Sequence, residues 1–548
     1  MLQTLDATAV RRWAAAGVDG LSQFEDELNR INVFPVADAD TGTNLRLTMQ
    51  SAFEALVRHP TAWTDSAVEA SPVPVGTVVS ALARGALLGA RGNSGLVLSQ
   101  VLRGLAEACD GDRAMSAARL RFGLRRCAEL ATAAFADPMP GTALSVLDAA
   151  AEAALACERD ILNRVAEAAV TAAAEALART PGQLPALARA GVVDAGGRGV
   201  LVLLDALAAV IAEREAPSAV SVPRLARPSA VLRGARESGS PEFDYEVMYL
   251  IERPSEDALA RLRDELAGLG DSVAVVGDGA GVWHVHVHCS DVGAAIEAGL
   301  SAGRPRRITV IRFADQLADQ LATVGEAPRF IRERAVVAVV DGDGAQRLFR
   351  GEGAEVVAGD KADPATLLAA IAGTRAAHVV VLPNTPTATA VADAAAGQAR
   401  DTGQDVVVVP TASAVQGLAA LAVHDPSRRA GDDVVAMAEA AAATRHGELV
   451  VATEEALTWV GRCESGDVLG LVCDEVVLIR PDVLSAACAL VDFMLSIGGE
   501  VVTALIGQGA PDGLVEALAA GVRASHPEAE LTAYDGGHPD SPLLVGVE

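Results

Sequence analysis

The sequence has almost no lysine. Of its 44 lysine and arginine residues, Lys361 is the single lysine and the others are arginines. A nucleotide-binding loop of the G-x-x-x-x-G-K-[ST] type needs a lysine followed by serine or threonine, so the sequence excludes such a loop. Any phosphoryl transfer by this protein would therefore depend on metal ions, arginines and backbone amides.

Positive charge and long apolar segments are also scarce. The 548 residues carry 72 acidic and 44 basic side chains, a formal net charge of -28, which argues against nucleic acid or an anionic membrane as a partner. Residues 1–16 hold charges and no apolar stretch of the signal-peptide kind. The longest apolar run, 199–212, contains Asp205 and is too short to span a bilayer. We therefore expect a cytoplasmic protein with no transmembrane segment.

Cysteine spacings typical of metal or redox sites are absent. The chain has 7 cysteines, an odd number with no C-x-x-C pair, as expected for buried thiols in a reducing compartment. The length exceeds what one hydrophobic core accommodates, so we expect roughly two to four domains.

The most informative stretch is N-V-F-P-V-A-D-A-D-T-G-T-N, residues 32–44. Asp38 and Asp40 are two residues apart, so in an extended chain their side chains point the same way and can converge on one hard cation. A helical pattern begins directly afterwards, and its free amides at 41–44 could bind a phosphate. Acids that face a phosphate need a metal between them, which favours Mg²⁺ and a nucleotide. The alternative is that Asp40 only caps a helix and Asp38 only makes a turn.

The first 215 residues are helical throughout by their apolar spacing. The predicted helices cover residues 5–17, 21–31, 41–58, 78–88, 96–108, 113–136, 143–156, 159–179, a short helix from Pro181 to Ala190, and 200–214. No strand pattern interrupts them. This part should form an antiparallel helical bundle or barrel.

Two further glycine-rich loops, 89–95 and 194–199, also stand directly before predicted helices. Glycine lets a backbone approach an anion closely, and each helix start supplies free amides. Asp194 offers a third acid, and Arg91 and Arg198 offer positive charge. Each loop alone could be an ordinary interhelix turn, but together with the acidic pair they favour a nucleotide site.

The rest of the chain alternates strands and helices after a linker rich in proline, serine and arginine at 216–240. Strands predicted at 245–251, 272–277, 282–288 and 306–312, with helices at 255–268 and 291–302, make a small α/β unit. From 335 to 548, valine-rich runs and helices predict α/β structure with a parallel sheet. The loops 382–385 and 410–413 follow strands in this sheet, which makes them candidate ligand contacts.

Three histidines share one face of the strand at 282–288. His284, His286 and His288 alternate with apolar residues, and Glu246 lies on another predicted strand. Such a set could ligate a transition metal. The alternative is a strand face that is simply polar.

The motifs at 32–44, 89–100 (G-A-R-G-N-S-G-x-x-L-S-Q) and 190–199 (A-G-V-V-D-A-G-G-R-G) resemble, in order and spacing, the large subunit of bacterial fatty acid kinase. That subunit belongs to the wider group built on a dihydroxyacetone kinase L-type (DhaL) domain. The resemblance implies a multidomain chain: an all-α eight-helix DhaL-type barrel at 1–215, the linker at 216–240, a small α/β middle domain at 241–325 and an α/β DegV-like domain at 330–548. It also implies an ATP-dependent kinase that phosphorylates a fatty acid carboxylate held by a separate acyl-binding DegV-family protein. We further expect a homodimer.

The resemblance assigns roles to individual residues. Asp38 and Asp40 would hold two Mg²⁺ ions, and Asn32 falls near a third acidic ligand of the dihydroxyacetone kinases. Nucleotide contacts would come from Gly42, Thr43, Asn44, Gly92, Asn93, Ser94, Gly95, Asp194, Gly196 and Gly197. Arg91 is a candidate to stabilise charge during transfer. Ala39 stands where the family usually has glycine, and we expect little consequence because alanine tolerates most helix-entry geometry.

The middle and C-terminal parts depart further from the family. The family has a cysteine at what looks like Glu246, and its V-H-V-H-T run matches Val285 to Cys289, which implies a metal bound by His286 and His288. The exchange of cysteine for Glu246 leaves the identity of the metal open, with zinc one candidate. The family's G-G-Q-T-M-N-P-S-T and G-G-Q-P segments appear only in altered form at 359–366 and 536–539.

Two other functions stay open. A dihydroxyacetone (glycerone) kinase would need a companion ketose-binding domain with a substrate-linking histidine, and this chain contains none. A nucleotide-loaded regulator or scaffold is disfavoured because both acids of the pair are intact.

Overall fold

The computed structural model describes residues 1–35, 39–59, 73–109, 111–214, 243–313 and 330–548. The chain divides into two compact units, one containing the barrel and the middle domain up to Ala327 and the other containing Pro328–Glu548. The predicted fold class is confirmed: a helical N-terminal domain is followed by α/β structure.

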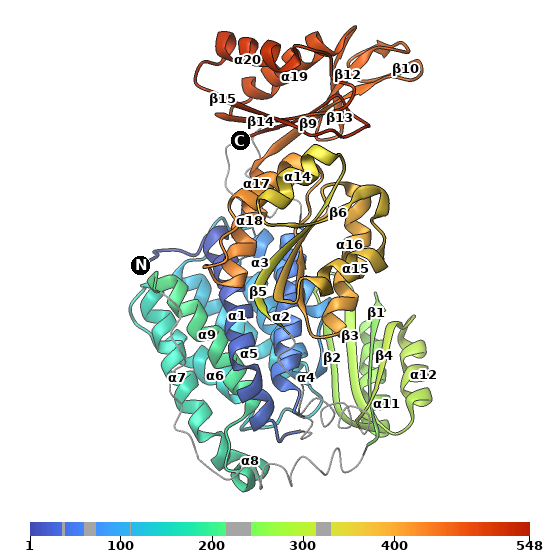
Figure 1. Cartoon of the computed structure of the whole chain (residues 1–548). Coiled ribbons are helices and arrows are strands. Elements are labelled where there is room, and N and C mark those ends of the chain that lie inside the picture. The colour runs from blue at the N-terminus through green and yellow to red at the C-terminus, as the bar shows by residue number, and fades with distance from the viewer. Residues whose placement is uncertain (36–38, 60–72, 110, 215–242, 314–329) are drawn as a thin grey trace. The chain divides into compact units, whose positions relative to one another are not determined.

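The N-terminal domain is a closed ring of helices. They are α1 (Ala7–Ile31), α2 (Thr41–Val57), α3 (Val75–Leu88), α4 (Gly92–Ala108), α5 (Ala117–Ala133), α6 (Ala143–Ala156), α7 (Leu162–Gln183), the short α8 (Pro185–Ala190) and α9 (Ala195–Ala212). Each helix from α1 to α7 packs against the next, and α9 packs against both α7 and α1. The described part of this domain is therefore a barrel of eight long helices, drawn from blue to green in Figure 1.

Several predicted boundaries in the barrel are wrong. Residues 92–95 and 195–199, predicted as loops, form the first turns of α4 and α9. Residues 5–17 and 21–31 form one helix, α1, because Gly17 and Gly20 are close packing points against α9 rather than breaks. A Cβ added at Gly17 would lie 3.0 Å from Leu203 Cδ2, and one at Gly20 would lie 3.0 Å from Val202 Cγ1. Pro181 lies inside α7, and the short helix begins at Pro185 instead.

The last barrel helix has the composition of a membrane span. Among the described residues, α9 is the helix long and apolar enough to cross a bilayer by length and composition, with a mean hydropathy of 1.8. However, 89% of that window is buried inside the protein. Its apolar character is accounted for by its packing against α1, α6 and α7.

The middle domain is an antiparallel sheet in the order β2-β3-β1-β4, with two helices. Its elements are β1 (Tyr245–Glu252), α11 (Glu256–Leu269), β2 (Gly270–Gly277), β3 (Val282–Cys289), α12 (Val292–Ala302) and β4 (Arg306–Arg312). One face packs on α11 and α12 through residues such as Tyr249 and Leu262. On the other face, Ala274 and Val276 pack against Leu87 and Leu96 of the barrel. The polar residues of this second face are thereby directed toward the barrel.

The second unit begins with the predicted parallel sheet, in the order β6-β5-β7-β8. Its strands are β5 (Arg332–Val340), β6 (Glu355–Ala358), β7 (Ala376–Leu382) and β8 (Asp405–Val408), and its helices are α14 (Asp343–Gly351), α15 (Pro364–Gly373), α16 (Pro386–Asp401), α17 (Ala414–Ala422) and α18 (Ala430–Ala443). Helices in the crossovers allow the strands to run parallel.

A second sheet follows that the sequence did not predict. It has the order β13-β12-β9-β16-β14-β15, and β14 with β15 is its one parallel pair among the described strands. The strands are β9 (Arg445–Val451), β12 (Val468–Val472), β13 (Glu475–Arg480), β14 (Val501–Ile506), β15 (Glu530–Asp535) and β16 (Leu543–Val547), with α19 (Val483–Ser496), α20 (Leu514–Ser525) and a small hairpin of β10 (Ala456–Leu457) and β11 (Arg462–Cys463). The expectation of one parallel sheet over 335–548 is therefore wrong for the second half. The connections from β9 to β12 and from β12 to β13 contain no helix, and both of these pairs are antiparallel.

Candidate active site

The N-terminal ends of α2 and α4 meet inside the first unit. The Arg91 amide donates to Thr48 Oγ1 at 3.2 Å. A Cβ at Gly92 would lie 2.6 Å from Asn44 Nδ2, and one at Gly95 would lie 2.4 Å from Thr48 Oγ1. Gly92 also has a φ of 58°, which favours glycine. Glycine in the second loop thus allows two helix starts to approach each other.

These ends, with that of α9, border a cavity of about 570 Å³. Its wall is apolar along the helices, for example at Trp13, Leu98, Val101, Leu203 and Leu207. Polar residues line it at the starts of α2, α4 and α9, namely Thr41, Asn93, Ser94 and Asp194, and Gly196 lies beside them. The structure therefore brings parts of all three predicted loops to one cavity.

The acidic loop is described in part. Asp40 is the N-cap residue of α2, and its side chain makes no capping hydrogen bond. The interpretation that the Asp40 carboxylate serves to cap the helix is therefore wrong. Asp38 lies outside the described residues, so its convergence with Asp40 stays a prediction. Asn32 is buried at the C-cap of α1.

Ala39 has a φ of 55°, in the left-handed region. An L-residue with a Cβ is disfavoured there by roughly 1–2 kcal/mol, and glycine is not. The expectation that alanine has little consequence at this position is wrong, because the residue is held in the conformation for which glycine is suited.

The first amides of α2 are occupied by a residue on α1. Asn29 Oδ1 accepts the amide of Gly42 at 2.7 Å and that of Thr43 at 3.2 Å. The Thr43 hydroxyl donates to Glu25 Oε1 at 2.7 Å, and Glu25 also accepts from Arg46 Nε at 2.8 Å. The free phosphate-binding amides expected at Gly42 and Thr43 are therefore not observed. Sequence reasoning missed Glu25 and Asn29, although their i, i+4 spacing on one helix face was a signal.

The start of α4 is different, since no side chain caps it. Arg91 is its exposed N-cap residue, and the glycine at 92 begins the helix. Asn93 Oδ1 is buried with no hydrogen-bond partner among the described residues. Ser94 lies beside it on the cavity wall. This helix start keeps polar groups available for a ligand, as the prediction requires.

The α9 loop uses its polar groups within the protein. Asp194 caps α9 by accepting the Gly197 amide at 2.7 Å, and burial raises the pKa of its carboxyl to about 6. Arg198 is 3% exposed, pairs with Glu27 at 3.0 Å and lies over the Phe24 ring at 5.1 Å. The Arg198 charge expected for the nucleotide is therefore compensated by α1. Gly196 remains on the cavity wall.

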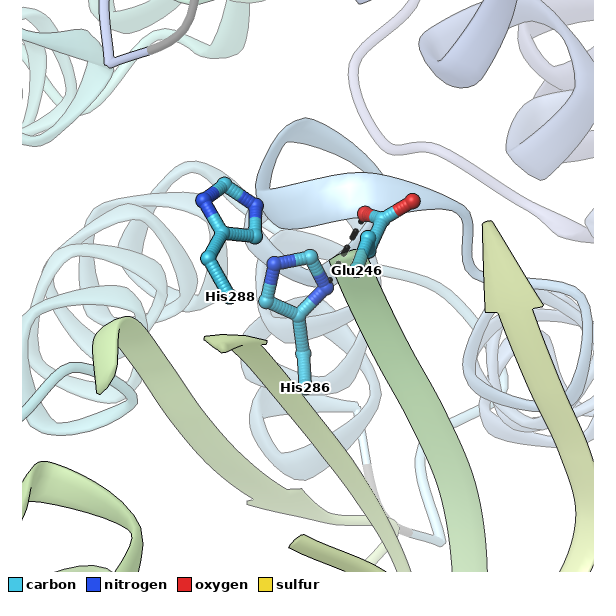
Figure 2. A group of neighbouring side chains, drawn as sticks. All are labelled: Glu246, His286 and His288. Atoms are coloured by element: carbon cyan, nitrogen blue, oxygen red, sulfur yellow. Dashed lines mark ion pairs between the residues drawn. The ribbon is translucent and has the colours of Figure 1, made fainter. Parts of the chain in front are cut away.

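Glu246, His286 and His288 form a buried cluster on β1 and β3. Their ligand atoms all lie within 4.8 Å of one another, and Glu246 Oε1 is 3.3 Å from His286 Nδ1 (Figure 2). Among the described residues this is the group with the spacing of a metal site. One carboxylate and two imidazoles suit zinc or another first-row transition metal.

His284 lies on the same strand face but outside this cluster. It pairs in register with Leu250 and Val276, so its neighbours are apolar. Burial lowers the pKa of His284 to about 4. Burial, and then the neighbouring His288, also lowers the pKa of His286. Both rings are thus favoured in the neutral form, which is the form that binds metals.

The cluster adjoins the helix starts of the barrel. A Cβ at Gly92 would lie 3.7 Å from Glu246 Oε1. Burial, and after it the Asp40 carboxylate, raises the pKa of Glu246 to about 8. The two sites predicted from separate motifs are therefore neighbours in one compact unit.

The loops 382–385 and 410–413 use their polar side chains in hydrogen bonds to each other and to the nearby backbone. Thr411 Oγ1 donates to Asn384 Oδ1 at 2.9 Å, and Asn384 Nδ2 donates to the Val339 carbonyl at 3.0 Å. Gln416 donates to the Thr444 carbonyl at 3.1 Å. These loops lie at the ends of β7 and β8 as predicted, but the structure uses their side chains to hold the sheet edge together.

Comparison with known proteins matches three consecutive parts of the chain. The DAK2 domain matches residues 35–209, the FakA-like middle domain of fatty acid kinase matches 242–320, and the FakA-like C-terminal domain matches 335–548. Protein YloV of Bacillus subtilis (strain 168) is 28% identical over 566 residues, covering 100% of both chains. Uncharacterized protein SH1689 of Staphylococcus haemolyticus (strain JCSC1435) is 27% identical over 556 residues, covering 97% of each.

Among solved structures, a DegV lipid-binding protein from Thermotoga maritima is similar at a TM-score of 0.32 and 12% identity. The similarity covers 39% of this chain and 98% of that one.

Proposed function

This chain belongs to the FakA-like family of fatty acid kinase proteins, and from that premise we propose that it transfers the γ-phosphoryl group of ATP to a fatty acid carboxylate. The acid would be held by a separate acyl-binding protein of the DegV type, and the product would be an acyl phosphate. The observation that carries the proposal is that the Glu246 carboxylate lies close to Asp40 and to Gly92 at the uncapped start of α4.

The barrel residues would position ATP. The amides at the start of α4 suit the phosphate end of a nucleotide. The unpartnered Asn93 Oδ1 is an acceptor, so it suits a hydrogen-bond donor of the nucleotide or a Mg²⁺ ion bound beside the phosphates. Asp40, whose carboxylate does not cap its helix, and Asp38 would hold Mg²⁺. Bound Mg²⁺ would neutralise charge on the phosphates. Arg91, exposed at the same helix start, would stabilise the charge that develops on the transferred group.

The middle domain would complete the site. Glu246, His286 and His288 provide a fitting donor set for a transition metal, which would supply a fixed positive charge close to the phosphates. A fatty acid carboxylate is already ionised at neutral pH. The chain therefore needs no general base to activate it, and its residues have only to bind and orient the two reactants.

The acceptor would come from outside the chain. The match of residues 335–548 to the C-terminal domain of the family supports a docking role for this part. A homodimer is also expected, with the second copy as part of the functional assembly.

The test is ATP turnover by the full chain with Mg²⁺, with and without a fatty-acid-loaded DegV-type protein. We expect acyl phosphate only when the partner is present, and none with Asp40→Asn. The matched control, Asp148→Asn on an exposed face of α6, should turn over like wild type. Equal ATP consumption without the partner, wild-type rates with Asp40→Asn, or transfer to dihydroxyacetone instead would each overturn the proposal.

A further inference from the structure

A carboxylate on β2 faces the cluster of Glu246, His286 and His288. Asp271 is the register partner of His288 in the β2–β3 pair. Its Oδ1 atom lies 3.3 Å from His288 Nδ1. The Asp271 side chain is 52% exposed, whereas that of His288 is 6% exposed. Asp271 therefore connects a buried imidazole to solvent at the edge strand of the sheet.

The backbone around Asp271 is shaped for this contact. The β2–β3 register shifts between Asp271 and Ala274, and Ser272 has a φ of 53°. A Cβ at Gly270 would lie only 1.8 Å from the His288 carbonyl oxygen, so glycine is required directly before Asp271. Such bulges commonly redirect a side chain beside a functional site. The approach of Asp271 to His288 is thus built into the strand.

The rings of Phe313 and His286 pack against the His288 ring, and neither accepts a hydrogen bond from it. Its ring centroid is 5.0 Å from that of Phe313, at 82°, and 5.0 Å from that of His286, at 57°. His288 Nδ1 is buried and makes no hydrogen bond of good geometry in the described part of the chain. A small rotation of either side chain would turn the 3.3 Å contact with Asp271 into one.

We propose that Asp271 is a positioning residue that accepts a hydrogen bond from the Nδ1–H group of His288. This selects the tautomer whose Nε2 carries the free electron pair and offers that atom to a metal shared with Glu246 and His286. A carboxylate in this role orients the imidazole and raises its basicity as a ligand. The inference rests on the metal site of the proposed function, and it adds a residue from a third strand to that site.

The position of Asp271 also relates this role to the nucleotide. Asp271 and Ser272 line the same cavity as Asn93 and Ser94. A substitution of Asp271 that frees the His288 ring would therefore also alter the cavity wall that contains Asn93 and Ser94. Nucleotide binding itself should persist, because Asp271 makes no described contact with the starts of α2 or α4.

The first measurement uses Zn²⁺ alone, titrated into the metal-free full chain in competition with a chromophoric chelator. Asp271→Ala should weaken Zn²⁺ binding by about 10–100-fold, the usual effect of removing such a partner. Asp271→Asn keeps an oxygen acceptor of similar shape and should fall between Ala and wild type. Asp264→Ala, an exposed acid of α11, is the matched control and should bind as wild type does.

The second measurement reads the tautomer of His288 without any metal. In ¹⁵N-histidine spectra of the full chain, the signal lost in His288→Gln should show a protonated Nδ1 in wild type and a tautomer mixture in Asp271→Ala. Unchanged Zn²⁺ affinity together with an unchanged tautomer in Asp271→Ala would overturn the positioning role. If wild type binds no Zn²⁺ but its tautomer still depends on Asp271, the metal part of the proposed function falls and the positioning role stands.

Discussion

Glu246, on the first strand of the middle domain, lies against Gly92, the first residue of α4: a Cβ at Gly92 would be 3.7 Å from Glu246 Oε1. The same glycine position is 2.6 Å from Asn44 Nδ2 at the start of α2. Gly92 is thus where the starts of α2 and α4 meet the cluster of Glu246, His286 and His288. A side chain there would press on both.

Gly92→Ala should impair ATP binding more than it impairs folding. The φ of 58° disfavours alanine by roughly 1–2 kcal/mol, and the new methyl group would contact Asn44. We expect ATP affinity to fall by at least about tenfold in calorimetry. Gly111→Ala is the matched control, since Gly111 has a φ of 72° but nothing within 4 Å. Equal ATP affinities in the two variants would contradict the prediction that Gly92 lies at the ATP site.

Ala39→Gly should stabilise the protein. Glycine relieves the strain of a φ of 55° but costs about 0.4–1 kcal/mol through the freedom of the unfolded chain. The net gain in the free energy of unfolding should reach up to about 1 kcal/mol, measured by chemical denaturation. A loss of stability equal to the ordinary cost of glycine would show that Ala39 is not strained.

His286→Ala and His288→Ala should each remove the transition metal, while His284→Ala should retain it. All three histidines lie on one buried strand face, but His284 is outside the cluster of ligand atoms. Elemental analysis of purified full-length protein is the measurement. Equal metal content in all three variants, or none in wild type, would reduce the strand to a buried polar face.

The stability of the barrel should fall as the pH rises from about 4 to 6 because of Asp194. Burial raises the pKa of its carboxyl from 3.8 to about 6, so the folded state binds the proton more tightly than the unfolded chain does. The contribution of this proton is present below pH 3.8 and is lost as the pH passes through the folded pKa.

Asp194→Asn should therefore gain stability relative to wild type across that interval, as followed by thermal unfolding. Ser116→Ala removes the N-cap side chain of α5, which does not titrate, and is the control that should leave the pH dependence as in wild type. A constant difference between Asp194→Asn and wild type at every pH would contradict the raised pKa.

A fragment of residues 1–327 should bind ATP and Mg²⁺. It should not transfer phosphate to a partner-bound fatty acid at the rate of the full-length chain. The motifs that would bind nucleotide precede residue 200, and the middle domain covers Leu87 and Leu96 of the barrel. A shorter fragment of residues 1–215 would expose this apolar contact. Full-length rates from the 1–327 fragment would remove the docking role proposed for the C-terminal unit.

Much of this architecture could be predicted from the sequence because it depends on short-range patterns. Helical spacing located the eight long barrel helices, and alternation located all four strands of the middle domain. Glycine-rich motifs marked the starts of α2, α4 and α9, although their glycines lie in the first turns of these helices rather than before them. A strand's alternation also showed that three histidines share one face, since successive side chains of a strand point to opposite sides.

Only the tertiary structure decided which of these groups are available and which are neighbours. Asn29 occupies the amides of Gly42 and Thr43, and Glu27 compensates Arg198, because α1 packs against both α2 and α9. Glu246 lies beside Gly92 because apolar contacts of Ala274 and Val276 hold one face of the middle-domain sheet against the barrel. The local pattern of a chain determines which way a side chain points along its own element. The partner that it meets there depends on packing between segments far apart in the sequence, and no local pattern contains that information.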